Sequence, residues 1–343
     1  QANRVGARFG FVTRRAGDRG ALRAGVHPEL LPGGRRVADP AERAEVEAVW
    51  GPLEATERGR DAHRILEAAA RHELDVLVLI GVDPLRDFPD ADLALRALQN
   101  VHYKVVQDLR LGDLEPFADA FLPAAASFER DGHVTTWEGR RQRVRPVRSP
   151  AGLARPDWEL FAGLAETMGA GLGFRSLEDL QEELAGLLEP REGLGRDPGF
   201  LFLPPVERTE KELILYSAPL LVDEGRLSVG ADRLKAALEE PAFVEVGGLD
   251  AERLGLVEGG RARVRTEAGE AELPVRVSPD LVEGTCFVPF NQPGLAANTL
   301  LSGRFSAVAT LEPVVGAGAP AGAPAGAASG GEPSPASASG GEP

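Results

Sequence analysis

The one cysteine of the 343-residue chain, Cys286, limits the chemistry that its side chains can perform. An iron–sulfur cluster needs several thiolates, and a structural zinc site usually needs cysteine and histidine at fixed spacing. A single thiol supplies neither, and it excludes a disulfide within the chain. Cys286 lies in the apolar run 284–290, which favours an inert buried thiol over the alternative of a reactive one.

The other residue types that bind metals form no recognisable cluster. The five histidines have neither HExxH spacing nor a close carboxylate partner, and we expect surface or packing roles for them: His27, His63, His72, His102 and His133. Aspartates at 83, 87, 90 and 92 could converge on a cation. A solvated loop is the simpler interpretation, so we expect no metal site.

Three carboxylates, Glu129, Asp131 and Glu138, have the residue types of a general acid/base set. No nucleophile or water-activating partner accompanies them. The favoured interpretation is that they stabilise turns with nearby arginines, namely Arg130, Arg140 and Arg141. We therefore expect no catalytic residue.

Asp108 is a candidate ligand-binding residue because of its position. It ends the predicted strand 102–108, and α/β sheets bind ligands at the carboxyl ends of their strands. The Gly-rich stretch after residue 12 does not have the GxGxxG spacing, and GxxxxGK does not occur. The sequence thus offers a position for a ligand without a nucleotide-binding fingerprint.

The elements that must position these residues alternate between helix and strand. The patterns predict helices over 39–50, 61–72, 92–100, 157–168 and 176–188, and strands over 8–12, 75–82, 102–108 and 118–122. The strand at 75–82 is almost wholly apolar, which is typical of a parallel strand covered on both faces near the middle of a sheet. Right-handed crossovers then give an α/β fold with a Rossmann-like parallel sheet.

The pattern changes after residue 188. Residues 189–210 are rich in Pro and Gly and lack periodicity, which predicts a linker. Short strands with Gly and Pro turns then predict a small β-barrel over 211–314, with strands at 212–217, 242–246, 261–266, 270–277 and 285–290. Residues 315–343 are mostly Gly, Ala, Pro and Ser, which predicts a disordered tail. Residues 1–188 form the predicted α/β domain.

Several of these stretches resemble the molybdopterin-type oxidoreductases. LPAAASFERDG (122–132) followed by WEGRRQ (137–142) is the most specific of them, and RPDWELFAGLAETMG (155–169) is similar to a helix of the same superfamily. Residues 249–277 resemble the double-psi β-barrel that ends those enzymes. The resemblance runs from about residue 7 to residue 313.

Within that superfamily, RAGDRGALRAG (15–25) and LLPGGR (30–35) resemble the G subunit of the bacterial proton-pumping NADH:quinone oxidoreductase, complex I. This resemblance implies a scaffold in the peripheral arm that supports electron transfer from NADH to quinone. It implies other peripheral-arm subunits as partners and a place at the cytoplasmic face of the membrane. The iron–sulfur clusters would belong to an amino-terminal region that this sequence lacks, so we expect no cofactor in this segment.

Two positions could be remnants of a cofactor site. Asn298 lies in NQPGLAANTLLS (291–302), which resembles the family's terminal segment, and in cofactor-bearing relatives the matching Asn lies near the pterin. The region of Asp108 meets the nucleotide part of the cofactor in those enzymes. The alternative for Asn298 is to satisfy buried backbone groups.

Two other functions stay open. The chain could be the carboxyl-terminal half of an active molybdopterin or tungstopterin oxidoreductase, such as a formate dehydrogenase, and would then use molybdopterin. It could also be a free-standing module that binds a nucleotide. The net charge of −15 disfavours nucleic acid and anionic membrane as partners. No apolar stretch reaches about 18 residues, so we expect no direct membrane insertion.

Overall fold

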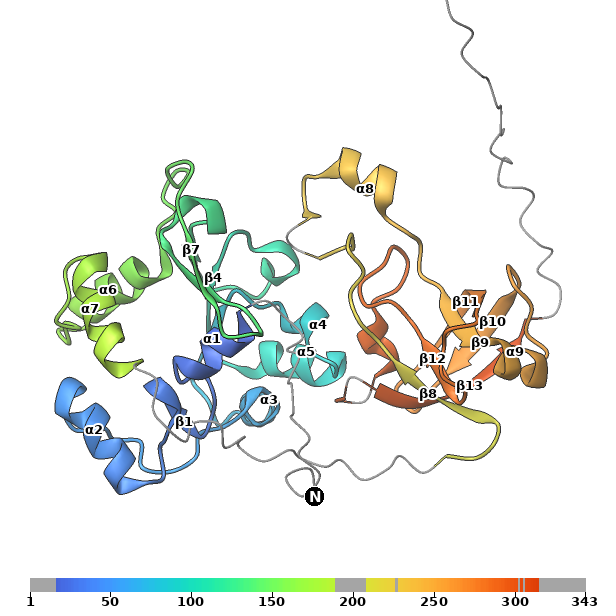
Figure 1. The fold of residues 1–343 in the computed structure, drawn as a ribbon, viewed down its shortest axis with the longest axis horizontal. Coiled ribbons are helices and arrows are strands. Elements are labelled where there is room, and N and C mark those ends of the chain that lie inside the picture. Colours follow the sequence, from blue (N-terminus) through green and yellow to red (C-terminus); the bar gives the residue numbers. More distant parts are fainter. Residues whose placement is uncertain (1–16, 189–207, 226–227, 302, 305, 315–343) are drawn as a thin grey trace, which may run out of the picture.

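The computed structural model describes residues 17–188, 208–225, 228–301, 303–304 and 306–314. Figure 1 shows two lobes, which we call the sheet lobe (residues 17–188) and the barrel lobe (residues 208–314). The predicted strand at 8–12, most of the predicted linker and the predicted tail lie outside the described residues.

A three-stranded parallel sheet forms the centre of the sheet lobe. Its order is β3 (Val76–Ile80), β4 (Tyr103–Asp108) and β5 (Ala120–Pro123). Helices α3 (Ala62–Ala70) and α5 (Ala91–Asn100) supply buried residues to one cluster with the inner side chains of β3 and β4. The predicted α/β class and parallel sheet are confirmed.

The prediction that the strand at 75–82 lies near the middle of the sheet is wrong for the residues that the structure describes. β3 is an edge strand among the described residues, because β4 is its one neighbour there. Its side chains alternate: Leu77 and Leu79 are buried, whereas Val76, Val78 and Ile80 are exposed. An apolar run indicates that both faces avoid water, but it does not say which segment covers each face.

The helices begin where the sequence places capping residues. α2 (Pro40–Trp50) follows Asp39, whose side chain accepts hydrogen bonds from two backbone N–H groups of the first turn. α7 (Leu177–Leu187) begins with a reciprocal capping box between Ser176 and Asp179. Predicted and observed starts agree within about one residue because these caps satisfy otherwise unpaired N–H groups.

Further elements complete the sheet lobe. They are α1 (Asp18–Arg23), β1 (Leu30–Leu31), η2 (Pro32–Gly34), β2 (Arg35–Arg36), α4 (Pro84–Asp87), η3 (Gly112–Leu114), η4 (Ser127–Glu129), β6 (Gly132–Thr135), β7 (Arg141–Val144) and α6 (Asp157–Thr167). β6 and β7 form an antiparallel hairpin, which follows the stretch 122–132 and includes the stretch 137–142. None of the helices among the described residues has the length and apolar character needed to span a membrane.

Six strands of the barrel lobe close in the order β10-β11-β9-β12-β8-β13. The lobe contains β8 (Glu212–Tyr216), α8 (Asp232–Leu238), β9 (Val244–Gly247), α9 (Gly248–Leu254), β10 (Arg261–Arg265), β11 (Glu270–Ser278), β12 (Thr285–Phe287), η6 (Ala297–Leu300) and β13 (Ser306–Pro313). The predicted barrel is confirmed. The five predicted strands match, and β13 is a sixth strand that the sequence patterns did not indicate.

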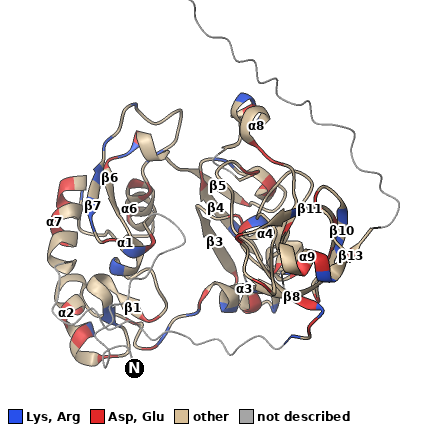
Figure 2. Cartoon of the chain, turned by 45° about the vertical axis from the view of Figure 1, so that its right-hand side comes forward, with Lys and Arg blue, Asp and Glu red and all other residues tan. Residues whose placement is uncertain are grey.

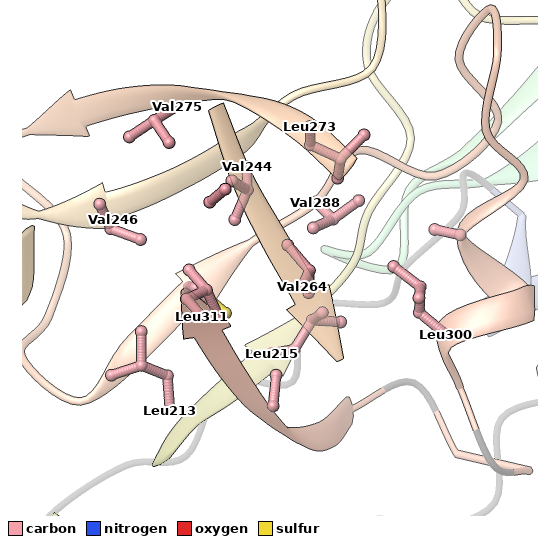
Figure 3. Packing of buried hydrophobic residues seen from close by; sticks show 14 of the residues in the cluster. Leu213, Leu215, Val244, Val246, Val264, Leu273, Val275, Val288, Leu300 and Leu311 are labelled. Atoms are coloured by element: carbon pink, nitrogen blue, oxygen red, sulfur yellow. The ribbon is translucent and has the colours of Figure 1, made fainter. Parts of the chain in front are cut away.

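The barrel core is filled by side chains from every strand. Figure 3 shows Leu213 and Leu215 from β8 facing Val244, Val264 and other aliphatic residues across the interior. Alternation along each strand sends one set of side chains inward and leaves charged residues outside, as in Arg261, Arg263 and Arg265 of β10. Because the sheet closes on itself, the barrel lobe buries its apolar face with its own residues.

Candidate functional site

The carboxyl edge of the parallel sheet gathers buried polar side chains. Asp83 follows β3 and caps α4 by accepting from the Leu85 N–H at 3.1 Å. Gln107 and Asp108 end β4, and all three polar residues are buried. The edge thus matches the usual ligand-binding position of α/β sheets.

Protein groups already engage these side chains. The Asp108 Oδ1 atom accepts a hydrogen bond from the Leu109 N–H at 2.6 Å. The Gln107 Nε2 atom donates to Asp157 Oδ1, the first residue of α6, at 2.8 Å. Asp157 also pairs with Arg130. No sequence pattern indicated the Gln107–Asp157 link, since 50 residues separate its two partners.

Asn298 connects the two lobes. Its Nδ2 atom donates to the backbone carbonyls of Leu85 in α4, at 2.7 Å, and of Phe88, which follows α4, at 3.1 Å. Its side chain is 1% exposed, and its Oδ1 atom has no hydrogen-bond partner. This geometry brings η6 of the barrel lobe against the segment that follows β3.

Arg86 of α4 makes a second contact with the barrel lobe. Its Nη1 atom donates to the Glu224 carbonyl of the barrel lobe at 3.1 Å, and its Nε atom donates to Asp113. The hydrogen bond with Asp113 raises the pKa of Arg86, so the arginine stays charged. α4 is therefore held to the barrel lobe by Asn298 and Arg86, whereas the Asp108 bond described above stays within the sheet lobe.

The carboxylates singled out beside the hairpin are all paired. Glu129 accepts from the Ala126 N–H at 3.0 Å and from Arg148 Nε at 2.7 Å, Asp131 pairs with Arg143, and Glu138 pairs with Arg140. The Ala126 hydrogen bond, followed by the Arg148 contacts, lowers the pKa of Glu129. Of the three expected arginine partners, Arg140 pairs with Glu138 as expected, whereas Arg130 binds Asp157 and Arg141 contacts His133.

A cavity of about 400 Å³ lies beside this hairpin and α6. It is lined by Glu129, Arg130, Asp131, Pro150, Ala154, Arg155, Pro156, Trp158, Glu159 and Leu177. Its charged wall residues form ion pairs with one another or with their neighbours, as Arg155 does with Glu159 at 3.7 Å. The wall therefore presents neutralised pairs rather than a net charge.

Cys286 is fully buried in the barrel core. Burial, with a smaller contribution from the nearby Asp250 carboxylate, raises the pKa of its thiol to about 12. Asp250 is itself buried and accepts from the Gly284 N–H at 2.7 Å while pairing with Arg253. A thiol in this setting is almost wholly protonated at neutral pH and makes a poor nucleophile.

The histidines are dispersed. His63 is beside Glu67 and the Phe88 ring, His72 contacts the Asn100 carbonyl, and His133 lies in the hairpin. Burial and the neighbouring guanidinium groups of Arg141 and Arg143 lower the pKa of His133. Among the described residues, no group of three His, Cys, Asp or Glu side chains has an arrangement that could hold a metal ion.

Two family models match the chain. The molybdopterin oxidoreductase model matches residues 3–167, and the molydopterin dinucleotide binding domain model matches residues 227–314. The acetylene hydratase of Pelobacter acetylenicus has a similar fold, with a TM-score of 0.51 and 18% identity over 72% of this chain and 46% of that one. The models cover the lobe that carries Asp108 and the lobe that carries Asn298.

Curated relatives give a finer comparison. The G subunit of NADH-quinone oxidoreductase from Mycobacterium bovis is 36% identical over 298 residues, which are 85% of this chain and 36% of that protein. The G subunit from Streptomyces coelicolor is 35% identical over 84% of this chain and 35% of its own length. The alpha subunit of the F420-dependent formate dehydrogenase 2 of Methanococcus maripaludis is 28% identical over 84% of this chain and 49% of its own length.

The chain thus spans about a third of the length of these two G subunits. The two family models and the extended alignments agree over both lobes. The chain therefore belongs to the molybdopterin oxidoreductase family and is similar over most of its length to the G subunit of NADH-quinone oxidoreductase.

Proposed function

We propose that this chain is the carboxyl-terminal part of the large peripheral-arm subunit, known as the G subunit, of a proton-pumping NADH:quinone oxidoreductase. The observation that carries the proposal is the alignment with G subunits at 35–36% identity over 84–85% of the chain, against 28% for the formate dehydrogenase subunit. In this role the segment supports electron transfer from NADH to quinone as a scaffold.

The proposal that this segment has no redox centre rests on the state of its single cysteine. One buried, protonated thiol does not ligate an iron–sulfur cluster. The iron–sulfur clusters of the parent subunit are proposed to lie in its amino-terminal region. Asp108 and Asn298 are proposed as remnants of an ancestral cofactor site that now serve structure.

A pterin at this position would need a hydrogen-bond donor, but the Asn298 amide nitrogen already donates to protein carbonyls. Both N–H groups of the amide donate to protein carbonyls, and the side chain is covered by the contact between the lobes. The Oδ1 atom is the one remaining polar group, and it is buried too. Asn298 in this arrangement offers no donor to a pterin, so the residues present do not fit the group at this position.

The finer features of the fold are proposed with the function. We place the α/β domain at 1–188, a linker at 189–210 and the barrel domain at 211–314. A hydrogen bond from Arg35 to the Leu187 carbonyl supports the first boundary, because it joins the end of α7 to the start of the sheet lobe. The barrel's two parallel pairs, β9–β11 and β8–β12, support a double-psi topology.

The proposed partners are the other peripheral-arm subunits of complex I, without nucleic acid and without direct membrane insertion. The proposed location is the cytoplasmic face of the membrane, reached through the complex. The names of the relatives support this, since they are subunits of one oxidoreductase. Copurification of those subunits with a tagged full-length protein is the expected result.

An active molybdopterin-dependent oxidoreductase, such as a formate dehydrogenase, is the second candidate. The match to a dinucleotide binding domain and the 28% identity to two formate dehydrogenase sequences favour it. Metal analysis of the full-length protein separates the two. We expect iron with no more than trace molybdenum or tungsten; stoichiometric molybdenum or tungsten, with formate oxidation, would replace our first choice.

A free-standing nucleotide-binding module is the third option, and it has a simple test. A nucleotide at 100 times its dissociation constant stabilises the folded state by about 2.7 kcal/mol. We expect no thermal shift of this chain with adenine or guanine nucleotides. A shift of several degrees that saturates with concentration would support the binding module instead.

A further inference from the structure

In the part of the chain that the structure describes, one face of the parallel sheet is apolar and exposed to water over β3 and the start of β4. Val76, Val78 and Ile80 of β3 are 52%, 48% and 43% exposed, and Tyr103 of β4 is 43% exposed. The register pairs Val76 with Tyr103, so these side chains form one continuous surface over β3 and the start of β4, whereas Gln107, the β4 partner of Ile80, is buried. Figure 2 shows the three strands side by side with no charged residue along β3.

This exposure is unusual for a parallel sheet. Parallel strands are joined by helical crossovers that lie on both faces, and such sheets occur almost only with both faces covered. Here the buried cluster contains residues of α3 and α5 together with Leu77 and Leu79, which point to the other face. A contiguous exposed apolar surface of this kind marks an interaction site.

Among the described strands, the edge of β3 is open as well. β3 pairs with β4 on one side, and no other described strand pairs with it. An unprotected apolar edge strand favours aggregation, and natural proteins cover or charge such edges. β3 carries no charge, so covering is the remaining protection.

The length of the relatives indicates what covers this surface. The G subunits of Mycobacterium bovis and Streptomyces coelicolor align over 36% and 35% of their own length, so nearly two thirds of each lies outside the aligned part. We propose that the face formed by Val76, Val78, Ile80 and Tyr103 is covered by an apolar helical layer from that further part of the polypeptide. This rests on the proposed function only for the length of the parent polypeptide.

Thiol labelling at single positions tests the proposal. Val78→Cys reports on the proposed interface, and Val282→Cys, which is 73% exposed in the barrel lobe, is the matched control. Ala97→Cys, fully buried in α5, checks that the sheet lobe is folded. Each variant is made in the full-length polypeptide and in this 343-residue chain, treated with a maleimide, and read by peptide mass spectrometry.

We expect the thiol of Val78→Cys to react at least tenfold more slowly than that of Val282→Cys in the full-length polypeptide, and at a similar rate in the 343-residue chain. Equal rates in the full-length polypeptide would overturn the proposal, whether or not the shorter chain folds. Protection in the dilute shorter chain would also overturn it, because the chain would then cover its own sheet. Protection that rises with its concentration would overturn it in favour of a second copy.

The outcome is independent of the proposed electron-transfer role. Metal analysis decides between a complex I scaffold and a molybdopterin enzyme, whereas the labelling rates report only which polypeptide covers β3. Stoichiometric molybdenum together with a protected thiol at position 78 would contradict the proposed function and support the proposed covering of the β3 face.

Discussion

In the barrel lobe six strands close on themselves and bury their inner face, whereas in the sheet lobe the described edge strand β3 buries one set of side chains and exposes the other. Cys286 and Leu215 lie side by side in the barrel core with no exposure. Val78 lies in the wholly apolar strand β3 and is about half exposed.

The difference follows from the strand connections. A closed barrel completes its hydrogen bonding and its core with its own residues. A parallel sheet needs a helical layer on each face, and a segment that contains one layer leaves the other face incomplete. The barrel lobe should therefore behave as a self-sufficient unit, and the sheet lobe as part of a larger one.

The largest expected contrast is in thiol reactivity. A pKa of about 12 leaves about one Cys286 thiol in 10⁴ ionised at pH 8, whereas an ordinary exposed thiol, with a pKa of about 8.5, is about one quarter ionised. In Val78→Cys the introduced thiol should react at least about 10³-fold faster than Cys286. Peptide-resolved maleimide labelling of the 343-residue chain measures both rates in one sample. Rates within tenfold of each other would show that the barrel opens readily.

Core truncation should separate the lobes next. Leu215→Ala removes a fully buried side chain beside Cys286 and should cost about 2–5 kcal/mol of unfolding free energy. Val78→Ala removes exposed methyl groups and should cost no more than about 0.5 kcal/mol in this chain. Urea unfolding followed by Cys286 reactivity gives the first value, and tryptophan fluorescence from the sheet lobe gives the second. Equal costs would contradict the view that the β3 face is uncovered.

The same contrast explains what the sequence could predict. Helix starts at Asp39 and Ser176 are local, because the capping side chain and the N–H groups it binds are within three residues. Barrel strands follow from alternation, which is also local. The position of β3 in the sheet could not be predicted, because the strands that pair with it and the helices that cover it come from segments far away in sequence.

The candidate site shows the same limit. Its residues could be chosen because Asp108 ends a strand and Asn298 lies in a family motif. Their roles depend on contacts across the fold: 213 residues separate Asn298 from Leu85, and 50 separate Gln107 from Asp157. No local pattern indicates such pairings. The contact that Asn298 makes between the lobes and the Gln107–Asp157 link within the sheet lobe are therefore visible only in the structure.

The contact that Asn298 makes between the lobes gives a test with an effect of intermediate size. Asn298→Ala leaves the carbonyls of Leu85 and Phe88 without their donor, at a cost of about 1–3 kcal/mol. Thr299→Ala is the matched control, because its exposed hydroxyl binds only the local Ala296 carbonyl. Hydrogen exchange should quicken over residues 84–88 in Asn298→Ala and stay unchanged in the control. Unchanged exchange in both variants would mean that the lobes are held together elsewhere.

The smallest predicted effect is a pH dependence confined to the sheet lobe. Carboxylates whose pKa is lowered by hydrogen bonds or ion pairs lie mostly there, among them Asp39, Asp119, Glu129 and Asp131, whereas the barrel lobe has Glu212. A group whose pKa is lower in the folded state stabilises the fold above its unfolded pKa, about 4 for these residues, and loses that contribution as pH falls through the folded value.

Acid should therefore loosen the sheet lobe before the barrel. All three tryptophans, at 50, 137 and 158, lie in the sheet lobe, so their fluorescence reports on it directly. We expect a change between about pH 4 and pH 2 while hydrogen exchange of barrel peptides stays slow. Glu129→Gln, which keeps the shape but removes the charge facing Arg148, should shift the change to a higher pH. A barrel that opens before the sheet lobe would contradict the view that its closed apolar core makes it the more self-sufficient unit.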